Sequence, residues 1–151
     1  MAVSDAYFAV GHPGVDEVVV FALEETGFGI RDTLSGGQEF GRALDLHDHW
    51  LVVGAPKADV PSANAGSVSL WDLRGGTTDL VGTAQGGAAS ERLGDAVALN
   101  SHTVFAGAPG AGGGEVRLFE AANGLATTRS TVAPAGTRPA ARWLIWTLLP
   151  P

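Results

Sequence analysis

The segment Leu51-Val-Val-Gly-Ala-Pro56 is the clearest indication of the fold, because it returns later in the chain as Val104-Phe-Ala-Gly-Ala-Pro109. A third version, Phe8-Ala-Val-Gly-His-Pro13, lies nearer the N-terminus. Each copy is an apolar triplet followed by Gly-x-Pro, and the copies begin at residues 8, 51 and 104. The copies are thus 43 and 53 residues apart. An internal repeat of about this length is typical of solenoids and propellers.

The sequence on both sides of this stretch repeats in the same order. Upstream, Phe40-Gly-Arg-Ala-Leu-Asp-Leu46 corresponds to Leu93-Gly-Asp-Ala-Val-Ala-Leu99. Downstream, Gly66-Ser-Val-Ser-Leu-Trp71 corresponds to Gly114-Glu-Val-Arg-Leu-Phe119 and, more loosely, to Asp16-Glu-Val-Val-Val-Phe21. Three blocks in one fixed order indicate a true repeat.

Each block has the pattern of a short β-strand. The small residues of Ala43–Leu46 and Ala96–Leu99 suit a crowded position near a propeller axis. The middle block is a continuous apolar triplet, which is typical of a strand buried on both faces. The last block alternates, as in Val68-Ser-Leu-Trp71, which indicates unequal burial of its two faces. Weaker fourth strands are expected at residues 29–34, 77–84 and 125–132.

Four strands per unit predict an all-β fold, a partial β-propeller of about two and a half four-stranded antiparallel blades. This chain alone is not expected to close the ring, since closed propellers have about 4 to 8 blades. The expected boundaries are residues 1–36 for a partial first blade lacking its first strand, 37–88 for the second blade and 89–133 for the third. Residues 134–151 are an atypical tail, expected to be disordered or non-native, and the chain is interpreted as a fragment.

The combination of Phe40-Gly41, an apolar strand, Gly54-Ala55-Pro56 and a Gly-x-Val-x-Leu-aromatic block resembles the FG-GAP repeat of integrin α subunits. The resemblance covers about residues 4–132, although His12 replaces the alanine in the first copy. It implies an extracellular or cell-surface location and a role in adhesion or protein binding. The loops at the blade ends, here residues 57–65 and 109–114, would then contact a protein or glycan partner.

Many FG-GAP blades hold calcium in an Asp-rich loop between their first two strands, but this chain departs from that pattern. Only one carboxylate, that of Asp48, is present in the two aligned segments, His47-Asp-His-Trp50 and Asn100-Ser-His-Thr103. Calcium takes about six to eight oxygen ligands. The repeat therefore resembles the calcium-free variant. His47 and His49 could share one strand face and bind zinc, yet Asp, Asn and Ser in the aligned segments favour a hairpin turn.

Composition and charge narrow the function classes. Apolar residues make up 45% of the chain, charged residues 17%, and the formal net charge is −7. No basic patch is present for nucleic acid, and no stretch of about 20 apolar residues suggests membrane insertion. The chain lacks cysteine, Gly-x-Ser-x-Gly and a suggestive Ser–His spacing. No catalytic, cofactor-binding or metal-binding residue is assigned, and no cofactor is expected.

The sequence favours a non-catalytic binding or adhesion module over an enzyme. Two alternatives stay open: a purely structural fragment of a larger propeller without a ligand site, and a propeller-borne hydrolase. For the hydrolase, only Arg42, Asp45, Asp48 and Asp95 gather near the first strands. Self-association through open blade faces is expected. Trp71 and Phe119 share one repeat position, at which an aromatic ring is predicted to wedge between blades.

Overall fold

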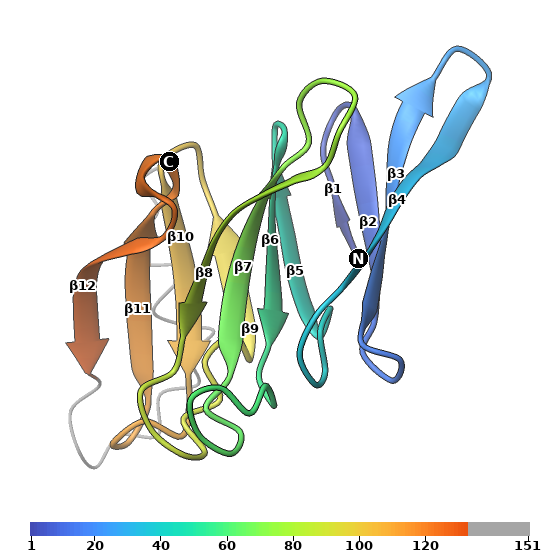
Figure 1. Cartoon of the computed structure of the whole chain (residues 1–151). Helices are drawn as coiled ribbons and strands as arrows, with labels where there is room; N and C mark the ends of the chain where they lie inside the picture. The colour runs from blue at the N-terminus through green and yellow to red at the C-terminus, as the bar shows by residue number, and fades with distance from the viewer. Residues whose placement is uncertain (133–151) are drawn as a thin grey trace.

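The computed structural model describes residues 1–132, and for residues 127–132 it describes the backbone alone. Three four-stranded antiparallel sheets stack face to face without closing into a ring (Figure 1), which confirms the predicted all-β partial propeller. Each sheet is a meander whose strands follow chain order. The strands are β1 (Ala2–Val3), β2 (Tyr7–His12), β3 (Glu17–Glu24), β4 (Gly27–Ser35), β5 (Ala43–His47), β6 (Trp50–Ala55), β7 (Ser67–Asp72), β8 (Asp79–Gln85), β9 (Ala96–Leu99), β10 (Thr103–Ala108), β11 (Glu115–Glu120) and β12 (Ala126–Val132).

We name the sheets blade 1 (β1–β4), blade 2 (β5–β8) and blade 3 (β9–β12). The first strand of each blade contacts the first strand of the next, β1 with β5 and β5 with β9. Strands nearest a propeller axis are arranged in this way. The fourth strands β4, β8 and β12 form the opposite edge of each sheet.

Blade 1 corrects one expectation from the sequence. The short strand β1 pairs with β2, with Ala2 opposite Ala9 and Val3 opposite Phe8. The prediction that the first blade lacks its first strand is therefore wrong, and residues 1–132 form three blades. Two residues are too few to show a strand periodicity, and no Phe-Gly turn precedes them. The tail predicted at residues 134–151, with residue 133, lies outside the described residues.

The segments weighed as metal loops are turns, as predicted. His47 pairs with Trp50 across β5 and β6, so Asp48 and His49 form a two-residue hairpin turn, with Asp48 at φ 52°. In blade 3 the side-chain oxygen of Asn100 accepts the backbone N–H of Thr103 at 2.8 Å. Asp and Asn suit these positions because they tolerate positive φ and bond to nearby backbone.

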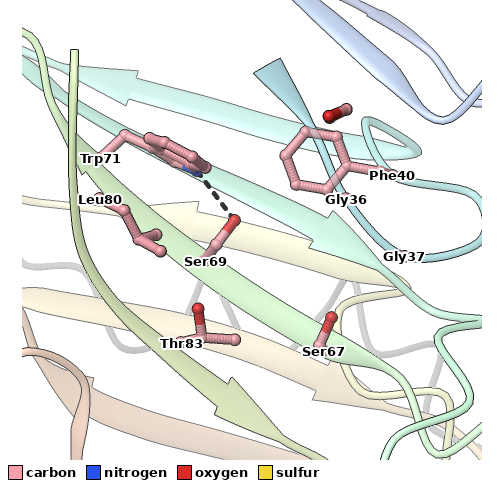
Figure 2. A pocket seen from close by; sticks show the side chains of 9 residues that line it. Gly36, Gly37, Phe40, Ser67, Ser69, Trp71, Leu80 and Thr83 are labelled. Atoms are coloured by element: carbon pink, nitrogen blue, oxygen red, sulfur yellow. Dashed lines mark hydrogen bonds between the residues drawn. The ribbon is translucent and has the colours of Figure 1, made fainter.

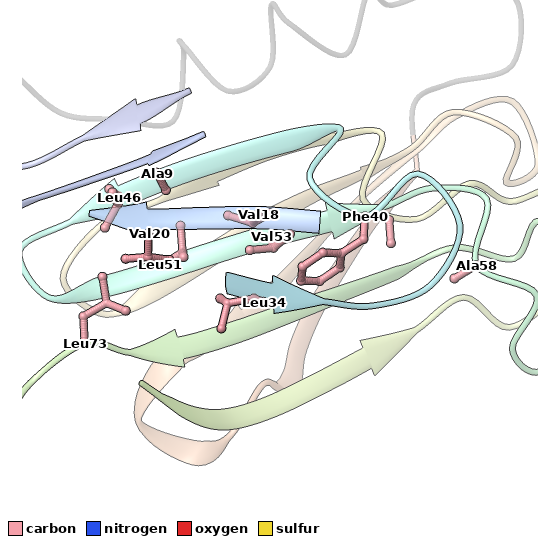
Figure 3. Close-up of a cluster of buried hydrophobic side chains, with 11 residues drawn as sticks. Ala9, Val18, Val20, Leu34, Phe40, Leu46, Leu51, Val53, Ala58 and Leu73 are labelled. Carbon is pink, nitrogen blue, oxygen red and sulfur yellow. The ribbon is translucent and has the colours of Figure 1, made fainter. Parts of the chain in front are cut away.

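In the part of the chain that the structure describes, the hydrophobic core consists of two clusters, one between each pair of neighbouring blades. Figure 3 shows the first, between blades 1 and 2. Leu51 and Val53 of β6 point into it while Val52 points into the second cluster, and all three are 0% exposed. This confirms that the middle block is buried on both faces. Phe119 is buried in the second cluster and Trp71 packs against the first, so both aromatic rings lie between blades as predicted.

Pairs of glycines bring neighbouring blades into backbone contact. A Cβ atom on Gly11 would lie 2.0 Å from the carbonyl oxygen of Gly41, and one on Gly54 would lie 2.1 Å from that of Gly94. Gly41 and Gly94 themselves have φ of 86° and 90°, which favours glycine. In blades 1 and 2, the glycine of the Gly-x-Pro segment thus packs on the glycine of the Phe-Gly or Leu-Gly segment in the next blade. This contact explains why both glycines recur in the repeat.

An ion pair of low exposure ties the link before blade 3 to strand β11. The Arg117 guanidinium lies 2.9 Å from Glu91, and their side chains are 17% and 13% exposed. Burial alone would raise the pKa of Glu91, but the N–H of Gly87 and the Arg117 guanidinium hold that pKa below its ordinary value. The ionised form of Glu91 is therefore favoured in the folded chain.

This shift predicts a loss of stability in acid. The folded pKa of Glu91 lies below the unfolded value, so its contribution is present above the unfolded pKa and is lost as the pH falls through the folded one. We expect Glu91→Gln to lower the free energy of unfolding by about 1–3 kcal/mol at neutral pH. The difference should shrink towards about pH 3, as measured by urea unfolding. The exposed Glu25→Gln serves as control, and a pH-independent difference would contradict the assignment.

Candidate functional site

A cavity of about 170 Å³ opens between blades 1 and 2. Figure 2 shows its lining from close by. Three structural parts supply the walls: the end of β4 with the link that follows it, strand β7 and strand β8. In chain order the lining residues are Ser35, Gly36, Gly37, Phe40, Ser67, Ser69, Trp71, Leu80 and Thr83.

The alternation of β7 places its polar residues in this cavity. Ser67, Ser69 and Trp71 share one face of the strand, and the side chains between them point into the core shared with blade 3. In the other repeats, Val19 and Arg117 occupy the position of Ser69. The side chain at this position is therefore smaller in blade 2 than in blades 1 and 3.

The lining combines aromatic rings with hydroxyl groups. The Trp71 indole Nε1 donates a hydrogen bond to Ser69 Oγ at 2.9 Å, which leaves the Ser69 hydroxyl proton able to donate to another group. Within residues 1–132 the hydroxyls of Ser35, Ser67 and Thr83 make no hydrogen bond to protein atoms. None of the described residues that line the cavity has a charged side chain. It therefore offers hydrogen bonds and apolar contact to a neutral group.

The loop of residues 57–65, predicted as a partner loop, joins β6 to β7 and is firmly held. Within the loop, Asp59 Oδ1 accepts the backbone N–H of Asn64 at 2.7 Å. Towards the link before blade 2, Lys57 Nζ lies 2.7 Å from a Glu39 carboxylate oxygen. Towards blade 3, the Ser90 N–H donates to the Ala63 carbonyl at 2.9 Å. These bonds fix the base of the loop and leave Val60, at its tip, 50% exposed.

The second predicted partner loop, residues 109–114, joins β10 to β11 and lies at the same end of the blades. It differs in composition, because Gly112, Gly113 and Gly114 all have positive φ and a Cβ on any of them would meet nothing within 4 Å. The Gly110 N–H donates to the Glu91 carbonyl at 3.1 Å. The 57–65 loop is thus the more strongly preformed of the two.

Of the four residues considered for a hydrolase, Arg42 and Asp95 belong to one group of charges and Asp48 lies apart from it. Arg42 lies 4.0 Å from Glu39 and Asp95 lies 2.7 Å from Arg92, and both arginines, after Lys57, help to lower the pKa of Glu39. Asp48 lies in the turn at the other end of β5. Burial raises the pKa of Asp45, opposed by the backbone N–H groups of Leu99 and Leu46 that its carboxylate accepts.

Asp45 therefore connects the first strands of blades 2 and 3. Across residues 1–132, no group of three or more His, Cys, Asp or Glu side chains is placed to hold a metal ion.

The cavity was not found from the sequence, which gave Trp71 only the role of a wedge. The sequence feature that pointed to the cavity was Ser69, which is smaller than Val19 and Arg117 at the same repeat position.

In the part of the chain that the structure describes, no helix has the length and apolar character needed to cross a bilayer. Comparison with known proteins adds no relative: no family model matches the chain, and no curated protein matches it either.

Proposed function

We propose that this chain is a non-catalytic binding module, an FG-GAP-like propeller segment that presents the 57–65 loop to a protein or glycan partner. The supporting observation is the preformed loop, whose base is bonded to its own blade and to both neighbouring links. A preformed loop loses little conformational entropy on binding, so more of its contact energy appears as affinity. The resemblance of the repeat adds an extracellular or cell-surface setting to this proposal.

Binding assays with the purified chain test this function. We expect the chain, presented in multivalent form, to bind members of an array of extracellular protein domains and glycans. Val60→Ser at the loop tip should weaken that binding about tenfold, since it removes an exposed apolar contact. Val15→Ser is the matched control, because Val15 is 65% exposed in the corresponding loop of blade 1. Absence of binding, or equal binding by the Val60 variant, would refute the proposal.

A structural role is the second candidate, supported by the open face of blade 1. Val3, Leu23, Phe28 and Ile30 are all more than half exposed on this blade. In blade 2, the corresponding face packs against blade 1. On this reading the blades complete a larger propeller and need no ligand of their own.

A further inference from the structure

We propose that the cavity between blades 1 and 2 binds a single neutral sugar ring. The cavity is a second site, separate from the 57–65 loop, so the inference goes beyond the proposed function. Three features of the cavity carry it: its size, the pairing of aromatic and hydroxyl groups in its wall, and the absence of charge from that wall.

The size of the cavity matches one ring. Its volume is about 170 Å³, below the roughly 300–1,000 Å³ typical of pockets for drug-sized ligands. Leu80 stands at its edge on β8, the outer strand of blade 2, and is 53% exposed. A terminal ring can therefore enter from solvent while the rest of a glycan stays outside.

The wall matches the two kinds of surface that a sugar ring offers. The partly buried Trp71 ring provides apolar contact for the C–H groups of the sugar, and an indole ring does so at low cost in side-chain entropy. The Phe40 ring beside it is 3% exposed and adds a small apolar edge to the wall. The Ser67, Ser69 and Thr83 hydroxyls can each donate and accept hydrogen bonds to sugar hydroxyls. Several polar groups at fixed positions in an otherwise apolar wall are typical of small-molecule sites.

The lack of charged side chains in the wall determines which sugars the cavity favours. Among residues 1–126, whose side chains the structure describes, no Lys, Arg, His, Asp or Glu lines the cavity. A carboxylate or phosphate would lose its water shell there without gaining an ionic partner, which is costly. The cavity therefore favours neutral hexoses and N-acetylhexosamines over uronic acids and sugar phosphates.

The test titrates the purified full chain with methyl glycosides of glucose, galactose, mannose and N-acetylglucosamine, with methyl glucuronide as the charged comparison. Ligand-observed NMR reports contact, and tryptophan fluorescence gives the dissociation constant. We expect at least one neutral glycoside to bind in the millimolar range, as suits a ligand of one ring. Methyl glucuronide should bind more weakly.

Ser69→Val is the informative variant, because blade 1 already carries valine, Val19, at this repeat position. It fills the cavity and removes a hydroxyl, so we expect about tenfold weaker binding or none, with the unfolding transition retained. Thr83→Ala provides a second, smaller change. Ser101→Ala is the control, since Ser101 is exposed in the β9–β10 turn of blade 3 and does not line the cavity.

Equal binding of a glycoside by the original chain and by Ser69→Val would overturn the sugar site. Tighter binding of methyl glucuronide would overturn it as well. If no glycoside binds while array partners still depend on Val60, the cavity proposal fails and the binding function stands. If neither glycosides nor array partners bind, both fail.

Discussion

Replacing Gly54 with alanine should lower the free energy of unfolding by about 3 kcal/mol, because the added methyl group has no space. Its carbon would lie 2.1 Å from the carbonyl oxygen of Gly94, an atom of the backbone of blade 3. A flexible side chain could move aside, but here two backbones must separate. That movement would also open the core between blades 2 and 3, where Val52 and Leu93 are 0% exposed.

The repeat supplies the control for this experiment. Gly107 holds the position of Gly54 in blade 3, yet among the described residues the nearest atom to a Cβ there is Ala96 Cβ at 3.7 Å. We expect Gly107→Ala to change stability by about 0.5 kcal/mol or less. Urea unfolding followed by tryptophan fluorescence compares the two variants. Equal losses would show that the glycine matters for strand geometry and not for the approach of blades.

The repeat was enough to predict the sheets, because strand identity depends on local alternation and on the order of blocks. The apolar triplet Leu51-Val-Val53 predicted a strand buried on both faces, and the two core clusters confirm it. The short strand Ala2–Val3 was missed since its pairing depends on the neighbouring β2 and not on its own pattern. The contact of Gly54 with Gly94 was likewise beyond the sequence, because it joins two different blades.

The cavity shows the same limit. Its walls come from residues 35–40 and residues 67–83, which meet only when blades 1 and 2 stack. From the sequence, Trp71 had one predicted role as a wedge, and the structure gives it a place in the cavity wall as well. A comparison of repeat positions would have shown that serine at 69 is smaller than its counterparts Val19 and Arg117. It would not have shown which residues face that space.

The open face of blade 1 has the residues of a buried surface. Phe8 and Phe21 stack at 4.3 Å between ring centres, and Phe28 meets Phe8 edge-on at 4.8 Å. Phe28 is 51% exposed and Ile30 is 69% exposed. Phe8 corresponds in the repeat to Leu51 of blade 2. Leu51 is fully buried, because blade 1 packs against that face of blade 2. A face of this kind is unfavourable in water, since each exposed apolar side chain forfeits about 1.5–3 kcal/mol of burial.

Within residues 1–132 no segment covers this face, and a second copy of the chain would bring apolar surface of the same kind against it. We therefore expect light scattering to give a mass above that of one chain, 15.4 kDa. Phe28→Lys together with Ile30→Lys should shift the chain towards the monomer, because two cations on one face repel a second copy and resist burial. Their circular dichroism should stay that of a β protein, since both side chains are more than half exposed.

Val15→Lys is the control for this experiment, because Val15 is 65% exposed but lies in the β2–β3 loop, away from that face. It adds the same kind of charge without touching the aromatic group. If association persists in the double variant and the control alike, blade 1 does not hold the copies together. If the original chain is a stable monomer, no second copy covers this face, and the structural role that depends on such contacts loses its support.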